Sequence, residues 1–384
     1  MAPSLLLCGL KGNIMSTKPL AKLHYAHHDE QFHQILMAEA KAYLAQKGDH
    51  RFANSALLLK NLLLLLFCVV CYLLSLHQVT IGLFALCYFG FVMSAMLANI
   101  NAQHDACHNV LFRSRLANRI FGRLVTLPLG LDPHYWQVRH VDYHHIYPNI
   151  QDYDLDMEEN GVFRQTPFQK WYPHMRFQPY YWPFIAGLSL PYIAWVFDWS
   201  DQLGKTPLAA DKKTLTGIKG WALFLGSKIL HFIIALIVPI LILSSVGISW
   251  YSVLWVYLIT QMVSSFIVVC LLLGTHWADP AFYTAPADNQ MEHGWYHQQF
   301  TTCCDWYPSP KIFNELLGGL NLHLTHHLFP GWSHRHYPAL MLIIERLAQQ
   351  YQLPYRRLSY VELLIQQQQF IRRLAQKPDK QSSD

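Results

Sequence analysis

The sequence predicts an all-α membrane protein, in which four transmembrane helices carry a cytoplasmic helical cap that holds a histidine-ligated metal site. Three observations support this fold class. Of the 384 residues, 52% are hydrophobic and only 14% are charged. Four apolar stretches have the length of about 20 residues that a helix needs to cross a hydrocarbon core of about 30 Å. Finally, eight of the 22 histidines fall into three tight clusters.

The four apolar stretches are the predicted spans, at Ala56–Leu76, Val79–Ile100, Trp221–Leu243 and Tyr251–Leu273. Lys60 lies near one end of the first span, and Lys228 and His231 lie inside the third. We expect these side chains to reach the interface or to face the helix bundle. Buried helices of a large soluble core are the alternative, but four runs of this length favour a membrane.

Three regions follow from the spans. Residues 1–50 form a cytoplasmic N-terminal region with an amphipathic helix over Glu30–Gln46, residues 51–362 form the membrane domain, and residues 363–384 form a polar C-terminal tail. Ser4–Leu10 is too short for a cleavable signal peptide because Lys11 ends its apolar run. Translation from Met15 is also consistent with the sequence.

The links between paired spans decide the predicted topology. His77–Gln78 and Ser244–Trp250 contain no Lys or Arg, so the positive-inside rule places both termini and all three clusters in the cytoplasm. Tyr180–Phe197 is apolar but contains two prolines, and we expect it to be interfacial or re-entrant. A fifth span would move the third cluster to the opposite side. The expected location is a bacterial inner membrane.

The histidine clusters have the spacing of helical metal ligands. They are His104 and His108; His140, His144 and His145; and His323, His326 and His327. Residues three and four apart share a helix face, whereas adjacent residues diverge by about 100°. One histidine of each adjacent pair is therefore expected to serve one metal and its neighbour a second metal. A single tetrahedral zinc takes only four ligands, so eight histidines indicate two metals.

His276 is a ninth candidate ligand, because it follows the fourth span within one helical turn. Val79 to His108 as one continuous helix would be about 45 Å long, which places the first cluster just above the membrane. Histidine ligands without thiolates leave zinc, iron, copper and nickel open. The eight cysteines include no CxxC pair, and we expect no disulfides on the cytoplasmic side.

The three clusters and their flanks resemble one known family. HDACH, WQVRHVDYHHIYPNIQDYDLD and GGLNLHLTHHLFPGWSHRHYP are similar to the histidine boxes of integral-membrane fatty acid desaturases. The resemblance extends from about Phe32 to about Leu347, and includes THW around His276 and the stretch HQQFTTCCDW. It implies a di-iron enzyme that uses dioxygen and two external electrons to introduce a cis double bond into an acyl chain.

The resemblance also assigns residues. It implies that the eight clustered histidines are iron ligands, with His276 as a further one, and that no catalytic residue is needed beyond the metal ligands. Asp105, Asp142 and Asn321 are candidates to orient the imidazoles by hydrogen bonds. The implied substrate is an acyl chain linked to lipid, coenzyme A or a carrier protein. Membrane lipid is a further expected partner, and nucleic acid is not.

Two departures from the front-end type of desaturase stand in the sequence. His323 occupies a position that is typically Gln, and no HPGG haem motif occurs. Both weigh against front-end regiochemistry, and the second implies a separate electron donor, a ferredoxin or a cytochrome. A basic face with Arg113, Arg115, Arg119 and Arg123 could dock such an acidic carrier, or could simply follow from attraction to the membrane surface.

Two alternatives stay open at this level. A lipid hydroxylase or carotenoid ketolase would share the iron site and differ in the fate of oxygen. A haem-binding or metal-handling membrane protein would place histidines within its spans, where only His231 clearly lies.

Overall fold

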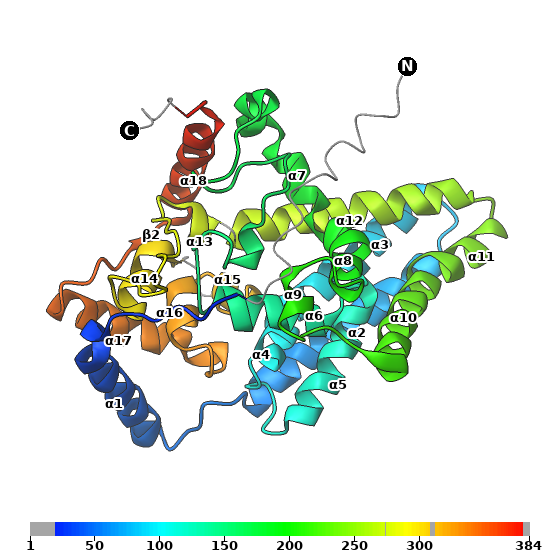
Figure 1. Cartoon of the computed structure of the whole chain (residues 1–384). Helices are drawn as coiled ribbons and strands as arrows, with labels where there is room; N and C mark the ends of the chain where they lie inside the picture. The colour runs from blue at the N-terminus through cyan, green and yellow to red at the C-terminus, as the bar shows by residue number, and fades with distance from the viewer. Residues whose placement is uncertain (1–19, 273, 308–311, 379–384) are drawn as a thin grey trace.

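The computed structural model describes residues 20–272, 274–307 and 312–378. Four helices are long and apolar enough to cross a membrane, namely Ser55–Leu76, Ile81–Cys107, Gly217–Ser244 and Trp250–Leu272. They agree with the four predicted spans. Figure 1 shows the hairpin of the third and fourth spans at the right edge of the molecule, while short helices gather at the other end.

The first two spans form a helical hairpin. Asn54 caps α2 (Ser55–Leu76) by accepting a hydrogen bond from the backbone N–H of Leu57, and Thr80 caps α3 (Ile81–Ala98) in the same way. The second span continues through a π-helical turn, Asn99–Gln103, into α4 (His104–Cys107). The predicted continuous helix up to the first histidine cluster is therefore present, with one π turn inserted just before the cluster.

The third and fourth spans form the other hairpin. The third consists of α10 (Gly217–Phe232), a π turn (Ile233–Ile237) and α11 (Val238–Ser244), and the fourth is α12 (Trp250–Leu272). Lys228 is buried in α10, where its Nζ lies 2.7 Å from Asp198 Oδ2 and donates to the Gly130 and Ala194 carbonyls. A buried charge in a span is thus paired within the bundle, as expected.

The predicted interfacial segment is a helix. It consists of α7 (Gln178–Tyr192), which contains Pro183 and Pro191, and the π turn Ile193–Phe197. It packs closely against α12, and Ser265 Oγ of α12 donates to the Ala186 carbonyl of α7 at 2.8 Å. The four candidate spans do not include this segment.

The remaining elements form the cap around the histidines. The amphipathic helix predicted over Glu30–Gln46 is α1 (Glu30–Lys47), and its Phe32, Leu36 and Ala40 are buried. Strands β1 (Asp305–Trp306) and β2 (Arg357–Leu358) form a short parallel pair. The other helices are α5 (Arg115–Thr126), α6 (Pro133–Gln137), α8 (Asp198–Gln202), α9 (Pro207–Ala210), α13 (Gly274–Trp277), α14 (Trp295–Thr302), α15 (Ile312–Leu316), α16 (His323–Leu328), α17 (Tyr337–Gln350) and α18 (Tyr360–Ala375).

The predicted polar tail from residue 363 is wrong over most of its length. Helix α18 begins at a capping box, in which Ser359 and Glu362 satisfy each other's backbone N–H groups. It buries Phe370 and Ile371 in a cluster with Trp277, so it belongs to the folded domain. Residues 379–384, which include the end of the predicted tail, lie outside the described part, as do Ser4–Leu10 and Met15.

The cysteines that the structure describes are free thiols, namely Cys68, Cys71, Cys87, Cys107, Cys270, Cys303 and Cys304.

Candidate metal centre

Four separate chain segments bring the nine candidate histidines together. The first cluster lies at the end of the second span, on α4 and its C-cap. The second lies on a π-helical turn, Val138–His144, and the residue that caps it. The third lies on α16, and His276 lies on α13, directly after the fourth span. π turns are rare and frequently occur at functional sites.

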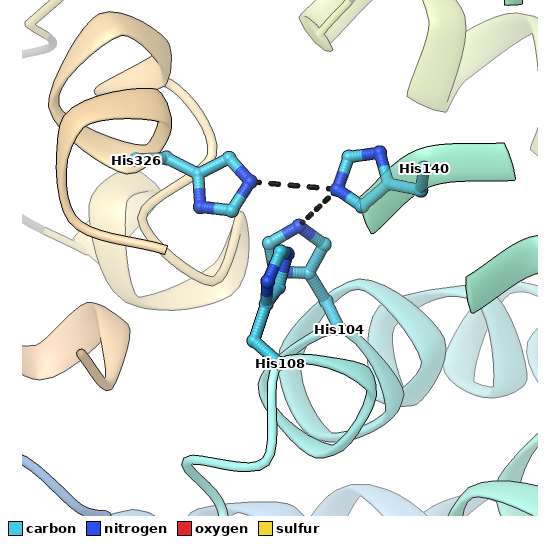
Figure 2. A group of neighbouring side chains, drawn as sticks. All are labelled: His104, His108, His140 and His326. Atoms are coloured by element: carbon cyan, nitrogen blue, oxygen red, sulfur yellow. Dashed lines mark hydrogen bonds between the residues drawn. The ribbon is translucent and has the colours of Figure 1, made fainter. Parts of the chain in front are cut away.

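The imidazoles form two groups of four. In the first group, His104, His108, His140 and His326 hold ligand-capable nitrogens within 4.8 Å of one another. The Nε2 atom of His140 lies 3.1 Å from that of His104 and 3.4 Å from that of His326. Figure 2 shows these rings converging from three segments of the chain.

The second group is formed by His144, His276, His323 and His327, again with ligand-capable nitrogens within 4.8 Å of one another. The Nε2 atoms of His144 and His276 are 3.1 Å apart. His145 lies between the groups: its Nε2 atom is 3.1 Å from that of His140, and its ring centroid is 4.3 Å from that of His327. The adjacent residues His326 and His327 serve different groups, as their angular separation predicts.

Buried ring nitrogens without hydrogen-bond partners show that the histidines are suited to hold metal ions. Three Nε2 atoms of the two groups are buried without a hydrogen-bond partner in the described part of the chain, those of His108, His323 and His327. Buried polar atoms are normally satisfied, and neutral imidazole lone pairs that face one another repel. A cation in each group would satisfy the facing nitrogens, and an all-nitrogen set without thiolates suits iron, zinc, copper or nickel.

Comparison with known proteins decides the family. Residues 78–359 match the family model described as fatty acid desaturase. The chain belongs to the fatty acid desaturase family. The resemblance drawn from the histidine boxes is thereby confirmed, and with it the prediction of an oxidoreductase that desaturates fatty acyl chains.

Three curated relatives are similar over most of this desaturase. The sn-1 linoleoyl-lipid 6-desaturase of Synechocystis sp. is 28% identical over 85% of this chain and 90% of its own length. The acyl-lipid (8-3)-desaturase of Physcomitrium patens is 26% identical over 87% of this chain and 70% of its own length. The Delta(5) fatty acid desaturase A of Dictyostelium discoideum is 24% identical over 88% of this chain and 74% of its own length.

Most imidazoles of the desaturase site are held in the neutral form that binds metals. Burial lowers the pKa of His108 to about 4 and that of His323 to about 3. Burial and neighbouring imidazoles lower the pKa of His276 and of His327 well below the usual value. Burial also lowers the pKa of His144, but the Asp154 carboxylate outweighs it and raises that pKa to about 9.

Three residues outside the predicted site hydrogen-bond to the clustered imidazoles. Asp154 accepts from Nδ1 of His144 at 3.1 Å, and Gln299 Oε1 accepts from Nδ1 of His327 at 2.8 Å. The Tyr337 hydroxyl lies 3.0 Å from Nδ1 of His326. Each bond uses the nitrogen that faces away from its group and leaves Nε2 for a metal, and the acceptor oxygens of Asp154 and Gln299 also fix the proton of their imidazoles on Nδ1.

The residues that were expected to play this role make other contacts. Asp105 accepts from Ser333 and His334, and Asp142 points outward to Lys213 at 2.7 Å. Asn321 donates to the Trp306 carbonyl. Within the described residues none of the three hydrogen-bonds to a clustered histidine. For Asp105 the reason is its place directly after His104 in a helix, where neighbouring side chains diverge by about 100°.

The sequence holds only a weak signal for the true partners. Asp154 and Gln299 fall within stretches that carry the family resemblance, DYDLD and HQQF, but ten residues separate Asp154 from His144 and 28 separate Gln299 from His327. No helical or strand period connects such positions, so only the tertiary fold reveals them.

A largely apolar cavity of about 280 Å³ leads to the centre. Its walls come from α3, α7, α12 and the π turns that follow α3 and α7, and five of the candidate histidines line it: His104, His140, His144, His276 and His323. Representative wall residues are Met96, Ile100, Leu190, Ile193, Val268 and Leu272. Because both groups contribute to its lining, an apolar chain inside the cavity would meet both at once.

Proposed function

We propose that the chain is an acyl-lipid desaturase that introduces a cis double bond into a fatty acyl chain at a two-iron centre, with dioxygen as co-substrate. The observation that carries this proposal is the largely apolar cavity that members of both histidine groups line. An unbranched hydrocarbon chain is the ligand that such a cavity favours, since burying each methylene contributes about 0.8 kcal/mol. The relatives named as acyl-lipid and linoleoyl-lipid desaturases support the lipid class.

In this proposal each group of four histidines holds one iron, and His145 lies within reach of both. When bound, the irons supply the reduction of dioxygen and the oxidising power that removes hydrogens from adjacent methylenes. The protein supplies the rest. Asp154, Gln299 and Tyr337 orient imidazoles from the outer side. The apolar cavity walls exclude water and hold the acyl chain against the histidines.

The relatives bear on the position of the double bond. They are named as a 6-desaturase, an (8-3)-desaturase and a Delta(5) desaturase, and they match most of this chain. These names favour front-end regiochemistry, against which His323 and the missing HPGG were expected to weigh. We infer a double bond at a position similar to those of the relatives, in an acyl chain that enters through the cavity.

A separate protein, a ferredoxin or a cytochrome, is the proposed source of electrons. Helix α5 is a poor docking site for it. Its arginines Arg115 and Arg119 lie beside an exposed apolar stripe, formed by Leu116, Ile120 and Leu124, each more than half exposed. An apolar stripe next to a basic one is typical of a helix that lies in a lipid interface. We therefore assign this basic face to the membrane surface.

The proposed arrangement in the membrane follows the lysine and arginine asymmetry. Both termini and the metal centre lie on the cytoplasmic side, and the two hairpin turns form the external side. A bacterial inner membrane is the proposed location. The membrane domain begins near residue 51, and α18 extends it to Ala375.

Two measurements test the proposed function. Fatty-acid profiling of a host that expresses the chain should reveal a product lighter by two hydrogens, and its double-bond position can be read from the same sample. The purified protein should contain about two irons per chain and little zinc. A product that gains oxygen would identify a hydroxylase instead, and one zinc with no iron would refute the two-iron centre.

A further inference from the structure

A short segment outside the histidine clusters connects two of them. Ser333–Tyr337, which we call the clamp, comprises Ser333, the 3₁₀ turn His334–His336 and the first residue of α17. Its Ser333, His334 and Tyr337 are almost fully buried. His334 is not part of either metal-ligating group, so its burial needs another explanation.

The clamp binds the first cluster through Asp105. Ser333 Oγ donates to Oδ2 of Asp105 at 2.8 Å, and Nδ1 of His334 donates to Oδ1 at 2.9 Å. Asp105 is 1% exposed and lies in the same helical turn as His104 and His108. Because both carboxylate oxygens are held, the rotation of this turn about its axis is fixed, and with it the direction of both imidazoles.

The same segment binds the third cluster through Tyr337. The Tyr337 hydroxyl lies 3.0 Å from Nδ1 of His326, whose Nε2 faces His140. Asp105 and Ser333 are 228 positions apart in the sequence, yet within the clamp only three residues lie between Ser333, which contacts one cluster, and Tyr337, which contacts the other. The distance between His104 and His326 is thus set by a short, rigid piece of backbone.

Several contacts hold the clamp itself. Lys60 on α2 donates to Nε2 of His334 at 3.3 Å, which leaves the proton on Nδ1 for Asp105. Arg335 forms a bidentate pair with Asp49, both distances being 2.7 Å. The clamp also sits tightly on Gly319, where a Cβ atom would lie 2.9 Å from side-chain atoms of His334 and of Tyr337.

We propose that the clamp sets the separation and orientation of the first and third histidine clusters, with His334 and Tyr337 as positioning residues for the first metal-ligating group. The inference rests on the proposed two-iron function. Such outer hydrogen bonds typically contribute 10- to 100-fold to metal affinity or activity. The clamp differs from Asp154, since it connects two clusters and Asp154 orients the imidazole of His144 alone.

A pair of matched hydroxyl deletions tests the clamp. Tyr337→Phe removes the hydroxyl at His326, whereas Tyr43→Phe removes one that lies 3.3 Å from Nδ1 of His336, on the side of the clamp away from the clusters. We expect Tyr337→Phe to lose iron to a chelator at least tenfold faster and to lower kcat about tenfold with little change in KM. Tyr43→Phe should remain within twofold of the wild type in both.

A second pair tests the other contact. His334→Asn keeps a donor near the position of Nδ1, and His334→Leu removes it. His334→Asn should therefore retain substantially more iron than His334→Leu. Equal iron retention in Tyr337→Phe and Tyr43→Phe would overturn the clamp. The same conclusion would follow if Tyr337→Phe had a lower melting temperature but the iron retention and kcat of the wild type. A wild-type protein without iron would instead refute the proposed function, and the clamp with it.

Discussion

Replacing Asp154 with Asn should weaken the second metal-ligating group. The carboxylate is 3% exposed, and each of its oxygens accepts a backbone N–H: Oδ1 from Asp156 at 3.1 Å and Oδ2 from Asn149 at 2.9 Å. Both oxygens also lie within 3.2 Å of Nδ1 of His144. An Asn side chain offers only one acceptor oxygen, so its NH₂ group must face a backbone N–H that then has no partner.

The magnitude has two parts. A buried donor left without a partner costs about 1–3 kcal/mol of folding free energy. Loss of the negative charge that holds the proton on Nδ1 of His144 should weaken metal binding about 10- to 100-fold. The assay is iron per chain during incubation with a chelator, together with product formation in membranes.

Asp152→Asn is the matched control, since it makes the same charge change two residues away on an exposed side chain. We expect the control to behave as the wild type. If Asp154→Asn keeps its iron at the wild-type rate and retains activity within twofold, the carboxylate does not hold His144 for a metal, and the argument from its hydrogen bonds fails.

Three further predictions follow from the same structure. His327→Ala should abolish desaturation while the protein still inserts in the membrane, whereas His174→Ala, outside the clusters, should leave activity largely intact; residual product in His327→Ala would contradict its role as a ligand. Burial raises the pKa of Asp305 to about 6. Because the folded pKa exceeds the unfolded value of 3.8, the contribution of this carboxyl to stability falls by about 3 kcal/mol as pH rises from 4 to above 6. The melting temperature of Asp305→Asn should therefore rise relative to that of the wild type over this pH range, and a constant difference would exclude the effect. Cysteine at Gln78 should react with an impermeant label from outside and cysteine at Asn160 only from inside; external labelling at Asn160 would overturn the topology.

The sequence was sufficient for features that depend on local periodicity. The spans are long apolar runs with caps such as Asn54. The division of His326 and His327 between different groups follows from helical geometry, since adjacent side chains on a helix diverge. The helical C-terminal segment was missed because its QQQQ run resembles a polar tail. Its buried residues, such as Phe370 and Ile371, have partners that only the tertiary structure brings together.

The partners of the imidazoles could not be predicted for a related reason. Asp105 was an attractive candidate because it sits beside His104, but its side chain points to Ser333, far along the chain. The residues that do contact the rings include Asp154, which precedes a 3₁₀ turn, and Tyr337, which begins α17. No helical or strand period links either residue to the imidazole that it contacts. Distance in sequence carries no information about such contacts.

The split of neighbouring histidines between the two groups has a consequence for how the centre is loaded. His326 and His327 share one turn of α16, and His140 and His144 share one π turn, yet the members of each pair belong to different groups. Filling one group therefore orders the backbone that presents ligands to the other. Binding of the second metal then costs less conformational entropy than binding of the first. Under the proposed assignment, iron titration of the metal-free protein should be cooperative, with half-loaded molecules scarce at every intermediate iron concentration.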